Sequence, residues 1–144
     1  MKVDLKVAKT AHVREVFKNL SAQTLSEIEA ADESLSSKKQ FAHNKARKKE
    51  AYVSLTDGRV LTVFGFNDFG EYLSMWTFAS DLYFESGLSA IRETRRFFKG
   101  LKFDKPVLSV TTSPHKDVGR WLELLGFEKT AENGVEQVFT YEPN

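Results

Sequence analysis

The stretch AYVSLTDGRVLTVFGFNDFGEYLSMWTFA, residues 51–79, decides the fold. It contains three segments rich in Val, Leu, Phe, Tyr and Trp, side chains that favour strands, at residues 51–56, 59–66 and 71–79. Asp57-Gly58 and the run NDFG at 67–70 separate these segments, and Gly, Asn and Asp tolerate the positive φ that tight hairpins need. The stretch therefore predicts an antiparallel meander of three strands.

Ahead of the meander, the sequence predicts one strand followed by helices. Residues 1–9 alternate apolar and charged side chains, the period-two pattern of a half-buried strand. Thr10 is a candidate helix cap. The apolar side chains after it have the spacing of one helix face, at Val13, Val16, Phe17 and Leu20. Residues 21–50 are less regular, and they predict a helix, a loop and a second helix.

After the meander, the sequence predicts a helix, a strand, a helix and two strands. The first helix has an apolar face at Leu88, Ile91, Phe98 and Leu101. Residues 106–112 predict a buried strand, and Ser113-Pro114 suits the start of the next helix because Ser caps free amides. That helix ends at Gly126, and its apolar face consists of Val118, Trp121, Leu122 and Leu125. The last strands, near residues 127–131 and 135–141, flank the hairpin signal Asn133-Gly134.

The composition limits the classes of function that are open to the chain. Its 144 residues suit one domain, residues 1–144, and 12 Phe residues predict an aromatic core. The 21 Lys and Arg residues nearly balance the 20 Asp and Glu residues, so nucleic acid is not an expected partner. There is no Cys, no signal-peptide pattern and no apolar stretch long enough for a bilayer, and we therefore expect a cytoplasmic protein without a membrane span. No metal site is expected either, since ligand-like spacing is missing from His12, His43 and His115.

The predicted order is strand, two helices, three antiparallel strands, helix, strand, helix and two strands. This order resembles the GNAT superfamily of N-acetyltransferases across nearly the whole chain. The segment Trp121-Leu122-Glu123-Leu124-Leu125-Gly126-Phe127 also resembles the aromatic-rich helix and Gly-Phe ending of that superfamily. The resemblance implies an α/β (α+β) fold, with a mixed, mostly antiparallel seven-stranded sheet flanked by about four helices, and acetyl-CoA or another acyl-CoA as cofactor.

A narrower resemblance is to the GNAT-like internal virion proteins of short-tailed lytic phages. The shared features are residues 78–81 (FASD), the basic helix that carries Arg92, Arg95 and Arg96, and Ser109-Val110 ahead of the last predicted helix. Residues 25–32 also resemble the early helix of that family. This resemblance implies a bacteriophage protein, located in the host cytoplasm or the virion, with a host or virion protein as its partner.

The GNAT resemblance implies an acyl-CoA site where the strand 71–79 ends and the next helix begins. GNAT enzymes hold the CoA diphosphate on backbone amides of a glycine-rich loop that opens this helix, where free N–H groups and the helix dipole favour anions. The acyl group is expected at the exit of the strand. Aligned in this way, the candidate cofactor-binding residues are Phe78, Ala79, Ser80, Gly87, Leu88 and Ser89.

Several positions depart from the GNAT pattern. Phe84 stands where these enzymes have Arg or Gln, and Asp81 and Glu85 place negative charge near the expected diphosphate. Counting back from Gly126, Leu122 takes the place of the catalytic Tyr, and an aliphatic side chain cannot protonate a leaving thiolate.

His115 takes the place of the family's Asn and is the catalytic candidate, because His exchanges protons near neutral pH. A solvent-exposed His is the simpler interpretation. The acidic residues that could supply a base are Asp68, Glu71 and Asp81. Two hypotheses remain open: a phage-type GNAT-fold protein with a degenerate acyl-CoA site, or an active acetyl-CoA-dependent N-acyltransferase that acts on a small amine.

Two basic segments stand out from the balanced overall charge. Residues 45–49 end one predicted helix, and a second group lies within two turns of another, at Arg92, Arg95, Arg96 and Lys99. Either group could contact an anionic partner, or form only the solvent-facing side of an amphipathic helix.

Overall fold

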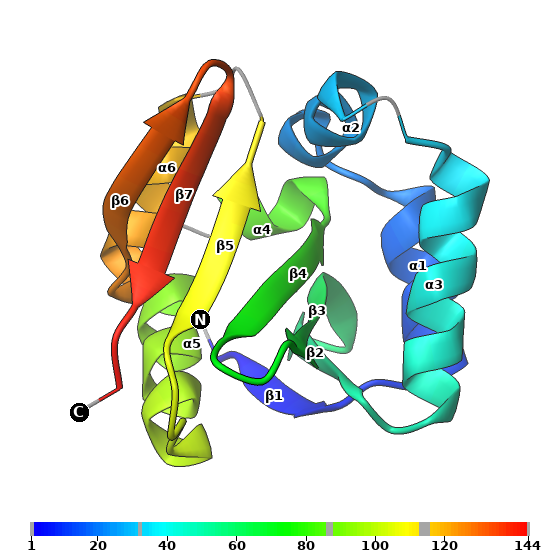
Figure 1. The fold of residues 1–144 in the computed structure, drawn as a ribbon. Coiled ribbons are helices and arrows are strands. Elements are labelled where there is room, and N and C mark those ends of the chain that lie inside the picture. The colour runs from blue at the N-terminus through cyan, green and yellow to red at the C-terminus, as the bar shows by residue number, and fades with distance from the viewer. Residues whose placement is uncertain (1, 32, 86–87, 113–115, 144) are drawn as a thin grey trace.

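The computed structural model describes residues 2–31, 33–85, 88–112 and 116–143. They form one seven-stranded sheet with helices on both faces (Figure 1). In spatial order, the strands are β1 (Asp4–Val7), β2 (Ala51–Thr56), β3 (Arg59–Asp68), β4 (Leu73–Ala79), β5 (Val107–Thr111), β7 (Glu136–Tyr141) and β6 (Glu128–Asn133). All neighbours are antiparallel except β4 and β5, which confirms the predicted mixed, mostly antiparallel sheet.

The predicted meander forms as β2, β3 and β4. Thr56 pairs with Arg59 across the first hairpin, and the two residues between them have positive φ, 50° at Asp57 and 74° at Gly58. This is the backbone conformation that the Asp-Gly pair favours. The β3–β4 pairing is continuous from Thr62–Ala79 to Asp68–Leu73, so β4 is paired with β3 along its whole length.

The described residues contain six helices, which corrects the expected number of about four. They are α1 (Thr10–Lys18), α2 (Ala22–Ala30), α3 (Leu35–Arg47), α4 (Asp81–Glu85), α5 (Leu88–Leu101) and α6 (Lys116–Leu125). Three of them, α1, α2 and α3, lie between the first two strands. This confirms the helix predicted after residue 10 and the two predicted within residues 21–50, whereas the overall predicted order counts only two helices there. The additional α4 has five residues, too few to show a helical period in the sequence.

The start of α1 also differs from the prediction. Thr10 is the first helical residue and not the cap. The backbone N–H of Lys9 instead donates to Nδ1 of His12 at 2.9 Å. His12 therefore has a structural role at the helix start. The predicted end of the last helix is confirmed, because Gly126 follows α6 with a φ of 108°.

The sheet separates two groups of buried side chains. The helices α1 and α3 cover β2, β3 and β4 on one face, where Val13, Val16 and Phe78 are among the buried residues. On the other face, α5 and α6 enclose an aromatic core around Phe98, whose ring lies 5.8–6.3 Å from five other aromatic rings. The aromatic core expected from the Phe content is confirmed.

Gly65 is required where β3 passes close to Trp76 of β4 and to the backbone just ahead of β2. A Cβ atom there would lie 2.5 Å from Cζ2 of Trp76 and 2.9 Å from the carbonyl oxygen of Glu50. We expect Gly65→Ala to lower the free energy of unfolding by about 1–3 kcal/mol, as overpacking does. Gly100→Ala is the control: it has open space in α5 and should be neutral or stabilise by up to about 1 kcal/mol. Urea unfolding of both variants tests this, and equal stabilities would contradict it.

No helix in the described ranges has both the length and the apolar character needed to cross a bilayer.

Candidate functional site

β4 and β5 run side by side over a short distance and then separate. They pair at Leu73–Val107 and at Ser74–Leu108. Residues 75–79 and 109–112 are all described, and none of them pairs across the gap between these two strands. The sheet therefore opens into a wedge between β4 and β5, which can be followed in Figure 1.

The separation leaves backbone groups of both strands without a strand partner. The N–H of Leu73 donates to the carbonyl oxygen of Pro106 at 2.9 Å, across the closed end of the wedge. Alternate residues of a strand direct their N–H and C=O groups to the same side. The N–H and C=O of Thr77 therefore point into the wedge from β4, and those of Val110 point into it from β5.

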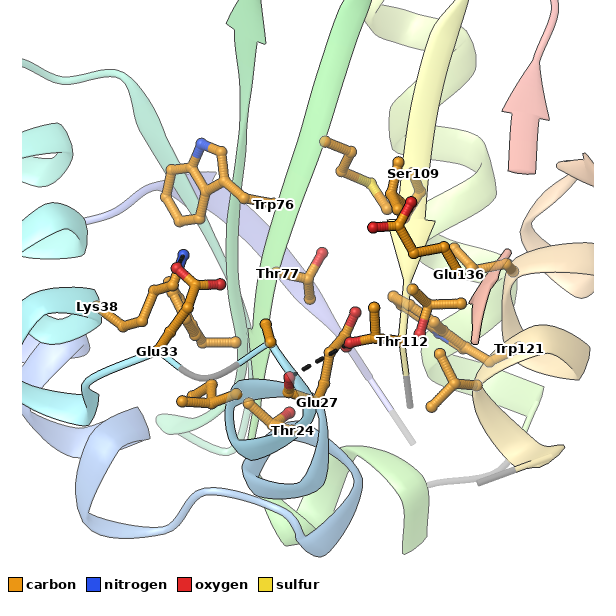
Figure 2. Close-up of a pocket in the computed structure, with 18 residues that line it drawn as sticks. Thr24, Glu27, Glu33, Lys38, Trp76, Thr77, Ser109, Thr112, Trp121 and Glu136 are labelled. Carbon is orange, nitrogen blue, oxygen red and sulfur yellow. Dashed lines mark hydrogen bonds and ion pairs between the residues drawn. The ribbon is translucent and has the colours of Figure 1, made fainter. Parts of the chain in front are cut away.

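A cavity of about 340 Å³ occupies the wedge. Figure 2 shows that its walls come from both strands and from helices on either side of them. The strands contribute residues 75–78 and 109–112. α2 contributes Thr24, Glu27 and Ile28, and α6 contributes Val118, Trp121 and Leu122. Ligands can thus meet polar groups on the α2 side and apolar side chains on the α6 side.

Glu27 projects from α2 into the wedge beside Thr112 (Figure 2). Burial raises the pKa of its carboxyl group above the usual value, although hydrogen bonds with the Thr111 side chain and the Thr112 backbone act in the opposite direction. A carboxylate with a raised pKa takes up a proton more readily near neutral pH than an ordinary Glu does. Glu27 is therefore a candidate general base.

Hydrogen bonds fix α2, and with it Glu27, against both strands. Ser21 caps the helix by accepting the N–H of Thr24 at 3.1 Å. The Thr24 hydroxyl oxygen accepts the N–H of Ala79 at 3.2 Å, and the N–H of Ser21 donates to the carbonyl oxygen of Ala79 at 2.9 Å. On the opposite strand, the Thr112 hydroxyl donates to the carbonyl oxygen of Glu27 at 3.5 Å. The helix bridges the open end of the wedge.

A polar side-chain atom is also buried in the wall of the cavity. Among the described residues, nothing forms a hydrogen bond with Oγ1 of Thr77, which is buried in the wall of the cavity. Such a group costs about 1–3 kcal/mol unless water or a ligand satisfies it. At the rim, Lys38 pairs with Glu33 at 2.5 Å, and Glu136 adds a second exposed carboxylate.

The predicted residues Phe78, Ala79 and Ser80 are all buried where β4 ends. Phe78 lines the cavity. The backbone of Ala79 is bonded to α2, and the Ser80 hydroxyl donates to the carbonyl oxygen of Val60 at 2.9 Å. Since Ala79 and Ser80 hold the fold together, the free backbone groups of β4 lie earlier in the strand, at Thr77.

Leu88 and Ser89 open α5, where Leu88 is 62% exposed and Ser89 is half-buried. Gly87 lies outside the described residues, and so does His115. The roles expected for these two residues stay predictions.

The side chains of Phe84 and Leu122 both pack against other apolar side chains. The Phe84 ring lies edge-on to Tyr83, with 5.4 Å between ring centroids, and 6.3 Å from Trp121. Leu122 is 1% exposed in the core that α5 and α6 cover. Both side chains therefore contribute to packing, and neither has a polar group that could bind a ligand.

The acidic residues considered as bases lie apart from the cavity lining. Asp68 accepts hydrogen bonds from the N–H of Gly70 at 2.8 Å and from Lys105 at 3.0 Å, and these bonds hold its pKa below the usual value. Glu71 and Asp81 are exposed. The carboxylates that line the cavity are instead Glu27 from α2 and, at its rim, Glu33 and Glu136.

Sequence reasoning missed Glu27, although a signal exists. Thr24, Glu27, Ile28 and Ala31 have the i, i+3, i+4, i+7 spacing of one helix face. On that face Ile28 is buried, so the carboxylate of Glu27 points inward with it. A charged residue on the apolar side of a helix indicates either a buried group that pairs with the charge or a functional site.

The raised pKa of Glu27 predicts how stability depends on pH. The folded state holds the proton of this group at pH values where the unfolded chain, with an ordinary pKa near 4.5, has lost it. The contribution of Glu27 is therefore fully present below that pKa and is lost as the pH rises through the higher pKa of the folded state. We expect the melting temperature of Glu27→Gln minus that of the native chain to increase as the pH is raised from 4 to 8. A difference that stays constant or decreases would contradict this.

Solved structures of N-acetyltransferases share this fold. PaiA N-acetyltransferase from Thermoplasma acidophilum, in complex with coenzyme A, matches with a TM-score of 0.69 and 9% identity over 99% of each chain. A GNAT-family acetyltransferase from Bacillus anthracis matches with a TM-score of 0.69 and 14% identity over 99% of this chain and 95% of that chain. A phosphinothricin acetyltransferase from Sinorhizobium meliloti, in complex with AcCoA, matches with a TM-score of 0.67 and 16% identity over 99% of this chain and 89% of that chain.

No protein-family model and no curated protein matches the sequence of the chain. The structural matches, at such low identity, establish the fold alone. The chain has the GNAT fold, as the resemblance of its element order implies.

Proposed function

We propose that the protein binds an acyl-CoA in the β4–β5 wedge and transfers the acyl group to an amine. The observation that carries this proposal is the wedge itself, where two parallel strands separate around a cavity and leave backbone groups unpaired. Two structural neighbours with the same fold hold coenzyme A or AcCoA, which supports the choice of ligand.

The residues of the wedge suit the pantetheine arm and the thioester of an acyl-CoA. The arm is a narrow, extended chain with two amide groups, and such a chain can pair with free strand edges as a β-strand does. The edges offer the N–H and C=O groups of Thr77 and Val110. The Thr77 hydroxyl, to which no described residue forms a hydrogen bond, adds a further polar contact inside the cavity.

Each part of the wedge has a role in this proposal. Acyl-CoA supplies an activated acyl group in the form of a thioester. The N–H of Thr77 is the donor placed to stabilise negative charge on the acyl oxygen. Glu27 accepts the proton of the attacking amine, and Leu122 and Val118 keep water away from the thioester. Leu122 gives no proton to the departing thiolate, so the thiolate leaves unprotonated or takes its proton from water.

The nucleotide end of the ligand contributes less than the acyl end. Asp81 and Glu85 add negative charge near a bound diphosphate, and Phe84 packs on Trp121 in place of a basic side chain. We therefore expect S-acetyl-pantetheine to bind within about tenfold of acetyl-CoA, a difference of about 1.4 kcal/mol. Calorimetry with both compounds measures this, and a loss of more than a hundredfold on removing the nucleotide would contradict it.

A second candidate function is that of a binding scaffold that has lost transfer activity. The buried Leu122 at the position of the expected proton donor favours it. In this case the bacteriophage origin, the host or virion protein partner and the cytoplasmic or virion location implied by the narrower resemblance would describe the protein. All of these stay predictions.

Two measurements separate these functions. Titration calorimetry with acetyl-CoA tests binding, and the absence of heat at millimolar ligand would contradict both the transferase and an intact acyl-CoA site. A thiol-release assay with acetyl-CoA and a panel of primary amines at pH 8 tests transfer. Binding together with amine-dependent thiol release supports the transferase, whereas binding without release supports the scaffold.

A further inference from the structure

A groove runs along the outer side of α5, where this helix meets α6. It encloses about 550 Å³, and its floor is apolar, formed by Leu88, Ile91 and Leu124. Leu88 is 62% exposed, an unusual position for such a large apolar side chain. The groove shares no lining residue with the wedge cavity, so it is a separate feature of the surface.

The rim of this α5–α6 groove is basic. Arg92, Arg95, Arg96 and Lys99 all line it, and all four side chains are exposed. Arg96 pairs with Glu93 at 3.0 Å, one turn away. Within the described ranges, no carboxylate forms an ion pair with the other three cations. The chain as a whole carries a net charge of +1, so this is a local concentration of charge with little compensation.

The spacing of the cations limits what can bind there. Arg92 and Lys99 are seven residues apart, which corresponds to about 10 Å along a helix. At the Lys99 end the basic rim meets carboxylates, because Glu128 and Glu142 line an adjoining hollow together with Arg95 and Lys99. A long polyanion such as a nucleic acid would be repelled where it continued past the groove. The matching ligand is short, acidic at its edges and apolar at its centre.

We propose that the α5–α6 groove binds an acidic amphipathic helix of a partner protein. The ridges of α5 and α6, with the apolar floor between them, accept a third helix, whose apolar stripe covers Leu88, Ile91 and Leu124. Carboxylates beside that stripe, at i, i+3 and i+7, face Arg92, Arg95 and Lys99. Binding removes the exposed Leu88 side chain from water and gives the unpaired cations their partners.

The probe is a fluorescent 16-residue peptide with Leu at helical spacing and Glu on both sides of the Leu stripe. Its controls are a scrambled peptide of the same composition, the same pattern with Gln in place of Glu, a 20-base-pair DNA duplex, and adenosine 3′,5′-bisphosphate. Fluorescence anisotropy at 50 mM and 300 mM salt gives the affinities. We expect the patterned acidic peptide to bind at least tenfold more tightly than the control peptides and the duplex, and to weaken as salt rises.

Variants of the groove provide the second arm. Arg92→Glu with Arg95→Glu should weaken binding of the peptide at least tenfold, and Leu88→Ser should weaken it about threefold or more. Arg14→Glu with Lys18→Glu makes the same change of charge on exposed residues of α1 and should leave the affinity within twofold. Circular dichroism confirms that each variant is folded, and Arg92→Gln with Arg95→Gln replaces the charge reversal if that variant is not.

Several results would overturn the proposal. One is no binding of the patterned peptide at 50 mM salt, and another is binding of the scrambled peptide or the duplex as tightly as the patterned peptide. A third is a loss of affinity for the peptide in the α1 control variant as large as that in the groove variant. Binding of the bisphosphate alone, lost in the groove variant, would assign the groove to a nucleotide instead. None of these measurements uses acetyl-CoA or transfer activity, so their outcome is independent of the proposed enzyme.

Discussion

Glu27→Gln should lower amine acylation by roughly 10² to 10⁴ in kcat/KM, the range that a positioned general base contributes. The amide keeps the size and most hydrogen-bonding capacity of the carboxylate but cannot accept the proton of the amine. Because Glu27 acts on the amine, the affinity for acetyl-CoA should stay within about threefold. Thiol-release kinetics and calorimetry measure the two quantities separately.

Glu29→Gln is the matched control for this substitution. Glu29 lies on the same helix but is exposed, and it does not line the cavity. The kcat/KM of Glu29→Gln should stay within twofold of the native value.

The acylation rate of the native enzyme should also increase as the pH rises through the raised pKa of Glu27. Glu27→Gln should lose this increase. A Glu27→Gln enzyme with native activity would remove Glu27 from the mechanism.

Phe98→Ala should lower the free energy of unfolding by about 3–5 kcal/mol, the cost of a large cavity in a core. Phe98 is 2% exposed, and its ring contacts rings from β3, from Phe127 just after α6, and from β7. The cavity would lie where helix α5 holds both halves of the sheet together. Chemical denaturation at pH 7 measures the change.

Phe69→Ala provides the comparison for Phe98. Phe69 is 59% exposed at the tip of the β3–β4 hairpin, where its ring stacks on that of Tyr72. Its loss should cost less than about 1 kcal/mol, since a surface substitution away from the core changes stability little. Similar losses for the two variants would mean that Phe98 does not occupy the centre of the core.

The strands were the most predictable part of the fold, for a local reason. Asp57-Gly58 adopts the positive φ that its composition favours, and residues on both sides of it have strong strand propensity. Gly126 likewise ends α6 where the apolar period stops. α4 could not be predicted, because its five residues are held by contacts such as that of Tyr83 with Trp121, which are distant in sequence.

The candidate site was harder to predict than the fold. The wedge depends on where the parallel pairing of β4 and β5 stops, and no property of residues 75–79 alone determines that point. The GNAT pattern does not point to Glu27, because this carboxylate reaches the cavity from α2. The same pattern points to Ala79 and Ser80, but their backbone and hydroxyl groups bind α2 and β3.

A crystal structure with acetyl-CoA would show whether the wedge is the acyl-CoA site. We expect the thioester inside the wedge, its pantetheine arm between β4 and β5, and hydrogen bonds between the ligand and the backbone of Thr77 and Val110. The amine would then approach from the side of Glu27. Crystals grown at millimolar acetyl-CoA that have an empty wedge, or the ligand bound elsewhere on the surface, would contradict the account.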